Sequence, residues 1–149
     1  MKTGLHRSKR IVAPQNRSPH GWWIGSYLLR FEFFDEEKRR LNRRCKAWEN
    51  TVLVKAKHRE EAYNKVSAIG QAQHGMEFRE DGTGRKGATL FEGLTMLLPV
   101  YGKLKDGAEV LWREYESVAV RTVKQIVRTK DRLEVFDDSM PTRGVAGLQ

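Results

Sequence analysis

Aromatic and aliphatic side chains fall on both alternating faces of residues 22–34, interrupted by a few polar ones, and this pattern predicts a long strand at the start of a sheet. One side of the extended chain carries Trp23, Tyr27, Leu29, Phe31 and Phe33, and the other carries Trp22, Ile24, Leu28 and Phe34. Arg30 and Glu32 interrupt the second side, so we expect one buried face and one partly covered face.

A second strand over residues 47–56 leads directly into a helix. Trp48, Val52, Val54 and Ala56 lie on one face of this strand, and Lys55 and Lys57 face the other way. The helix begins at Arg59 with Glu60 and Glu61 in its first turn, where the positive end of the helix dipole favours acids. The later positions Ala62, Val66 and Ile69 recur at helical spacing, so this helix is expected to lie across one face of the sheet.

Strand signals return after the helix. Residues 76–79 are a candidate for a short strand, and residues 88–98 alternate loosely until Pro99. Asp106-Gly107 indicates a tight hairpin, from which residues 108–115 would return as a further strand. The apolar spacing after Ser117 predicts a second helix near 117–130, despite several β-branched residues that lower its propensity.

These elements predict an α+β fold, in which one helix packs across an antiparallel sheet of about four strands. The expected order along the chain is β-β-α-β-β, with the second helix near 117–130. The length of 149 residues suits one domain with a core, which we place at residues 21–136. Residues 1–20 are expected to be a flexible basic arm and residues 137–149 a flexible tail, because neither has enough apolar content to offset its ordering entropy.

The segments in this order resemble a small bacterial family. The resemblance rests on the strand Trp23 to Phe33, Trp48-Glu49, Lys55-Ala56, Glu60-Glu61-Ala62, Lys65, Gly70 and the hairpin Asp106-Gly107-Ala108-Glu109-Val110. Over residues 22–112 the chain resembles the domain-of-unknown-function family DUF4288. The resemblance implies a small, uncharacterised α+β protein from a bacterium, and it transfers no catalytic residues.

The basic residues are concentrated in a few segments. The formal net charge is +9 at pH 7, and residues 1–20 contain five basic residues and no acidic one. Such clusters steer a protein towards polyanions. The residues expected to bind a nucleic acid or an acidic protein are Arg7, Lys9, Arg10, Arg17, Arg39, Arg40, Arg43, Arg44, Lys46, Arg85 and Lys86.

The glycine-rich segment 82–87 resembles a phosphate-binding loop only superficially. No Ser or Thr follows Lys86, and an apolar strand rather than a helix follows the loop. We therefore interpret it as a hairpin turn in which Arg85 and Lys86 retain a weak capacity for anion contact.

Residue types with catalytic or metal-binding chemistry are scattered. The histidines are His6, His20, His58 and His74, and none has ligand spacing to another or to Cys45. Cys45 stands among basic residues, a setting that increases thiol reactivity, but an incidental surface cysteine is the commoner case. Glu49, Glu92 and Glu109 would form a general acid–base set with Arg113 if they met on one sheet face, whereas an exposed charge ladder is the commoner arrangement. We predict no catalytic residue, no metal and no cofactor.

The features that would direct the chain out of the cytoplasm are missing from the sequence. The basic N-terminus lacks the apolar region of a secretory signal, the apolar stretches are too short and too charged to span a bilayer, and one cysteine cannot form an internal disulfide. A cytoplasmic location without membrane contact is the expectation, and the oligomeric state is left open, a homodimer included.

The function predicted from these features is that of a small non-enzymatic binding or regulatory protein that recognises an acidic protein partner. An immunity-like or defence-associated role is compatible with such a protein. The alternative is a nucleic-acid-binding protein that uses the basic arm and the Arg/Lys cluster at 39–46.

Overall fold

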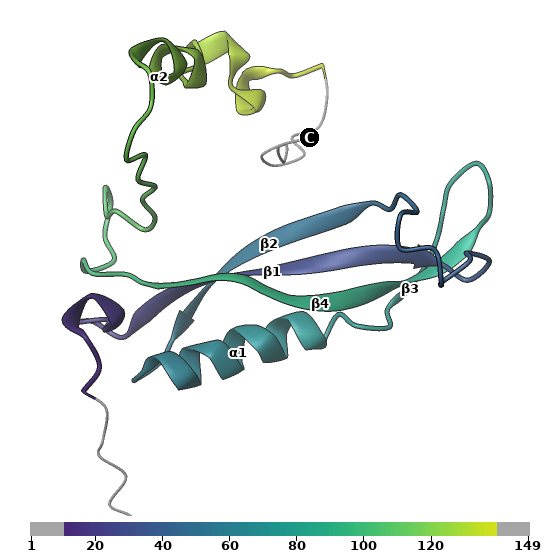
Figure 1. The fold of residues 1–149 in the computed structure, drawn as a ribbon, viewed down its shortest axis with the longest axis horizontal. Helices are drawn as coiled ribbons and strands as arrows, with labels where there is room; N and C mark the ends of the chain where they lie inside the picture. Colours follow the sequence, from purple (N-terminus) through teal and green to yellow (C-terminus); the bar gives the residue numbers. More distant parts are fainter. Residues whose placement is uncertain (1–10, 140–149) are drawn as a thin grey trace, which may run out of the picture. The chain divides into compact units, whose positions relative to one another are not determined.

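A four-stranded antiparallel sheet organises the first part of the chain in the computed structural model, which describes residues 11–139 (Figure 1). The strands are β1 (Trp22–Phe33), β2 (Ala47–Lys55), β3 (Glu77–Arg79) and β4 (Lys86–Pro99), and their order across the sheet is β2-β1-β4-β3. Helix α1 (Arg59–Gln71) connects β2 to β3 and lies along one face of the sheet. The predicted α+β class, with a helix across an antiparallel sheet, is therefore confirmed.

Helix α1 begins where the local sequence supplies a cap. Nδ1 of His58 accepts a hydrogen bond from the backbone N–H of Glu61 at 3.2 Å, and the Glu61 carboxylate accepts one from the N–H of Lys57 at 2.9 Å. This reciprocal pair satisfies N–H groups that have no partner inside the helix. The pKa of Glu61 is lowered, first by the hydrogen bond from the Lys57 backbone.

The core lies between α1 and the sheet. Its buried side chains are Trp23, Tyr27, Leu29, Val54, Ala56, Ala62 and Val66, with Val52, Phe91, Leu94 and Leu97 packed against them. Two glycines let the layers approach closely: a Cβ at Gly25 would lie 2.4 Å from Cγ2 of Val66, and a Cβ at Gly70 would lie 2.4 Å from Cε2 of Phe91. The absence of a side chain at these two positions therefore allows the helix to pack directly on the strands.

The chain before β1 is tied to the sheet. A short 3-10 helix spans Pro14–Asn16, and the hydroxyl of Ser18 bonds the carbonyl oxygens of Trp22 at 2.7 Å and Val100 at 3.1 Å. The Tyr101 hydroxyl also donates to the carbonyl oxygen of Gln15. In the arm expected at residues 1–20, Gln15 and Ser18 thus have defined partners. The flexibility of the arm as a whole remains a prediction.

The expected hairpin and strand at 103–115 are not formed, so this prediction was wrong. Asp106-Gly107 does make a turn, in which the N–H of Ala108 donates to the carbonyl of Lys105 at 3.0 Å. Residues 108–115 nevertheless form no strand, and the sheet ends with β4 at Pro99, after which the N–H of Val100 donates to the carbonyl of Trp22. The fourth strand is instead β3, the short candidate at 76–79.

The contacts divide the chain into two units, Met1–Trp112 and Arg113–Gln149. The second unit contains α2 (Val120–Ile126) and 3-10 turns at Lys130–Arg132 and Glu134–Phe136. Helix α2 is shorter than the helix expected near 117–130, has no side-chain cap and buries none of its residues. Its β-branched residues favour other conformations when no packing compensates. Whether residues 21–136 act as one domain remains a prediction.

Candidate macromolecule-binding surface

Two basic segments that are distant in the sequence meet at one end of the sheet. We call this the distal end: the loop 34–46 between β1 and β2, strand β3, and the turn 80–85 that joins β3 to β4 (Figure 1). The N–H of Phe34 donates to the carbonyl of Lys86 at 3.0 Å, and Nη2 of Arg85 lies 2.6 Å from Oδ1 of Asp35. The turn 80–85 closes a hairpin in which Arg79 pairs with Lys86, as the sequence predicted.

The loop 34–46 is held by Arg43. Its guanidinium bonds the carboxylates of Glu32 at 2.9 Å and Glu36 at 3.1 Å, and it also donates to the carbonyls of Lys38 and Arg40 at 2.9 and 2.8 Å. The Arg43 side chain is 18% exposed and the two carboxylates are 12% exposed. Arg43 was expected to contact a partner, but its donors are already used within the loop, so it acts here as a positioning residue.

Glu32 extends this network into the sheet. Arg30 donates to it at 2.9 Å and to Glu92 at 2.9 Å, and Lys38 lies 3.6 Å from its other carboxylate oxygen. The pKa of Glu32 is lowered, chiefly by the hydrogen bond from Arg30 and then by that from Arg43. The pKa of Arg30 is raised, first by the same bond to Glu32. The Glu32 carboxylate therefore stays ionised, and it attaches Lys38 and Arg43 of the loop to strand β1.

Four other cations of the loop remain available. Arg39, Arg40, Arg44 and Lys46 are exposed, and their side chains belong to no ion pair among residues 11–139. We refer to these four residues as the free cations. Of the acidic residues in this loop, Glu36 is paired with Arg43 and Asp35 with Arg85, and Glu37 is exposed, so basic residues outnumber unpaired acids and the loop presents positive charge to an approaching molecule.

A row of aromatic rings crosses the distal end, and Lys46, one of the free cations, contacts one of these rings. Trp48 meets Phe31 with ring centroids 5.0 Å apart, and Phe78 lies 5.5 Å from both Phe31 and Phe33. A Cβ at Gly87 would lie 2.6 Å from the Phe78 ring, so the glycine makes room for that ring. The alternation on β1 and β2 predicted Phe31, Phe33 and Trp48 as sheet residues, but nothing local in the sequence joined them to Phe78.

The turn 80–85 contributes less free charge than expected. The guanidinium of Arg85 is bonded to Asp35 and lies 3.8 Å from the centroid of the Phe33 ring. The pKa of Arg85 is raised and that of Asp35 lowered, in each case first by this hydrogen bond. Lys86 is exposed at the start of β4. The anion contact proposed for this turn therefore rests more on Lys86 than on Arg85.

Among the N-terminal basic residues, Arg17 is described, and it is not part of the distal end. Arg17 precedes the opposite end of β1, a strand of 12 residues that is about 36–40 Å long. Nε of Arg17 donates to the carbonyl of Val12 at 2.8 Å. Arg7, Lys9 and Arg10 lie outside the described residues, so their expected role stays a prediction.

The candidate acid–base set does not gather into a site. Glu92 bonds Arg30, Glu109 lies in the segment that forms no strand, and Arg113 belongs to the second unit. Nδ1 of His74 accepts from the N–H of Phe91 at 3.0 Å, and Cys45 is exposed. Over the part of the chain that the structure describes, no group of three or more His, Cys, Asp or Glu side chains is arranged to hold a metal ion.

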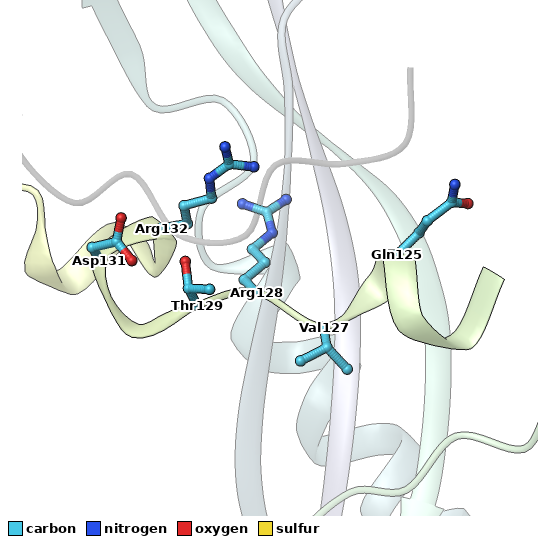
Figure 2. Close-up of a pocket in the computed structure, with 6 residues that line it drawn as sticks. All are labelled: Gln125, Val127, Arg128, Thr129, Asp131 and Arg132. Carbon is cyan, nitrogen blue, oxygen red and sulfur yellow. The ribbon is translucent and has the colours of Figure 1, made fainter. Parts of the chain in front are cut away.

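A shallow hollow in the second unit is a further candidate site (Figure 2). It is lined by Gln125, Val127, Arg128, Thr129, Asp131 and Arg132. Figure 2 shows Arg128 and Arg132 pointing to the same side, while Val127 points away from them. All the residues that line the hollow are exposed, so it offers no buried polar group that would fix a ligand.

No helix between residues 11 and 139 is both long enough and apolar enough to cross a membrane.

Comparison with known families gives one match. A model of the family described as a domain of unknown function, DUF4288, matches residues 22–112. The chain belongs to this family. The DUF4288 match begins with β1 and ends at Trp112, where the first unit also ends, so it contains the whole distal end and leaves out Arg17 and the second unit. A search of curated proteins and a search of solved structures each return no match.

Proposed function

We propose that this DUF4288 protein is a small non-enzymatic binding protein that recognises an acidic macromolecule through the free cations of the distal end. An acidic protein is the partner first expected, and a nucleic acid is the alternative. A defence-associated role would give such binding a biological setting, which the neighbouring genes would test.

The observation that supports this proposal is that the basic residues of loop 34–46 have two different roles: one holds the loop in place and four remain exposed. Arg43 takes up Glu32 and Glu36, and this leaves the free cations exposed on a loop with fixed geometry. A pre-positioned loop loses less conformational entropy when it binds than a disordered tail does. The distal end is therefore better suited to specific recognition than a charged terminus would be.

The proposal is tested by the retention of the full-length protein on immobilised heparin, a generic polyanion. A variant that replaces the free cations with glutamine (R39Q/R40Q/R44Q/K46Q) should elute at a clearly lower salt concentration than the wild type, because four positive charges no longer face the polyanion. The matched control K103Q/K105Q/R121Q/K124Q removes the same formal charge from exposed positions elsewhere. Equal elution of the two variants would show that net charge alone governs retention and would refute the proposal.

A further inference from the structure

Lys46, one of the free cations, contacts a half-exposed tryptophan, and this pairing identifies a chemical class of partner. Building on the proposed function, we propose that the distal end binds single-stranded nucleic acid, with one base stacked on Trp48 and the adjoining phosphates held by the free cations. Proteins that bind single strands without sequence preference combine these two elements, a basic path for the backbone and aromatic side chains for the bases.

Trp48 has the exposure and the support that stacking requires. Trp48 is 52% exposed, whereas on the same face of β2 Val54 is buried and Val52 is partly buried against the core. Phe31 meets the indole at an interplanar angle of 76°, and Phe31 is in turn packed against Phe78. The indole is thus held in place by a partly buried ring and still offers apolar surface to solvent.

The ammonium group of Lys46 contacts the Trp48 indole and is free to move from the ring to a phosphate. Nζ of Lys46 lies 5.4 Å from the centroid of the Trp48 ring, in a cation–π contact that is open to solvent. Lys46 and Trp48 are two residues apart at the start of β2, so their side chains emerge on the same side of the extended chain. A base that approaches the indole would displace this flexible ammonium towards the neighbouring phosphate.

The geometry favours a single strand over the other acidic partners. A duplex keeps its base faces stacked inside, so it would use the free cations and leave Trp48 unused. An acidic protein would also pair with the cations, and it differs from a single strand in that no oligonucleotide would then bind at the distal end. The duplex alternative predicts binding that does not depend on the indole.

The test measures fluorescence anisotropy of a labelled oligothymidylate of 20 nucleotides with the full-length protein, at several salt concentrations. Trp48→Leu should weaken binding about 5- to 100-fold, the range found when a stacking side chain is removed, and should leave the salt dependence unchanged. Trp48→Phe, which keeps a ring, should restore most of the affinity. Trp112→Leu is the matched control, because Trp112 is 51% exposed and lies outside the distal end.

The charge variant reports on the phosphates in the same assay. The slope of log K against log salt should decrease in magnitude by about 0.7 for each phosphate that the protein no longer neutralises, and hence by about 2–3 in R39Q/R40Q/R44Q/K46Q. Far-UV circular dichroism and thermal unfolding of each variant distinguish misfolding from a specific loss of binding.

Three results would overturn the inference. In the first, a duplex of the same length binds as tightly as the single strand; in the second, Trp48→Leu binds like the wild type. In the third, no single strand binds at low salt while heparin retention still depends on the free cations, and the proposed function then survives without this partner. If no single strand binds and heparin retention does not depend on the free cations either, both proposals are refuted.

Discussion

The two ends of the sheet are stabilised by different interactions, apolar burial at one end and ion pairs with partly exposed rings at the other. Under α1, the strands bury apolar side chains against Val66 and Ala62, and glycine at position 25 brings the layers into contact. At the distal end, which α1 does not cover, the same strands β1 and β2 carry partly exposed rings and a loop held by ion pairs. The covered end supplies most of the stability, because buried apolar area contributes more than exposed charge pairs do.

This difference separates stability from recognition along a single strand. Residues 23–29 of β1 are buried almost without interruption, whereas residues 30–33 are only partly buried. A surface that binds a partner has to remain exposed, so it cannot also contribute a dry core. Loop 34–46 can therefore vary its exposed residues at little cost to the fold, provided that Arg43 and its carboxylates are kept.

The largest effect is expected from the contact between Gly25 and Val66. Gly25→Ala should lower the free energy of unfolding by about 2 kcal/mol, because the new Cβ would lie 2.4 Å from Cγ2 of Val66. Val66→Ala should also cost about 2 kcal/mol, because it leaves a cavity in the core. The double variant should be less destabilised than the sum by about 1 kcal/mol, since the added methyl group enters the vacated space.

Urea unfolding of the four proteins in this cycle measures the coupling directly. Strict additivity of the two single effects would mean that α1 does not pack on β1 in this way. In that case the contrast between the covered end and the distal end would lose its basis.

An intermediate effect is expected from Arg43. Arg43→Met should lower the free energy of unfolding by about 1–2 kcal/mol, because Glu32 and Glu36 lose a charged hydrogen-bond partner. It should also speed tryptic cleavage within loop 34–46, because the loop loses its internal support. Arg44→Met is the control: it removes one cleavage site and one charge in the same way, but from an exposed side chain. Similar behaviour of the two variants would show that the loop is not held by Arg43.

The smallest effect concerns pH and Glu32. The pKa of Glu32 is lower in the folded chain than its ordinary value of 4.5, so the unfolded chain binds more protons in acid. The stability from this carboxylate is complete above about pH 4.5 and is lost as the pH falls through the lower folded pKa. Glu32→Gln should cost about 0.5–1 kcal/mol at pH 7 and flatten this acid dependence in thermal unfolding. Glu37→Gln, an exposed change in the same loop, should leave the dependence as in the wild type.

Local patterns predicted the elements that depend on local interactions. The alternation in β1 and β2 and the acids at the start of α1 each follow from side chains within a few residues, so those elements lie where they were expected. The hairpin at 103–115 was predicted from an equally good local signal and was wrong: the turn at Asp106-Gly107 forms, but a turn alone does not make the flanking residues pair as strands. The helix near 117–130 is shorter than its periodicity suggested, since periodicity alone does not supply a surface to pack on.

The chain by itself determined an α+β class, the family and the presence of several basic segments. Only the tertiary structure decided which of those basic residues are available: it used Arg43 and Arg85 in ion pairs, left Arg39, Arg40, Arg44 and Lys46 exposed, and set Lys46 over the Trp48 ring. Charge is a property of composition and can be counted in a sequence. Whether a charge is neutralised depends on distances of a few ångströms between residues that are far apart in the chain, and only folding fixes these distances.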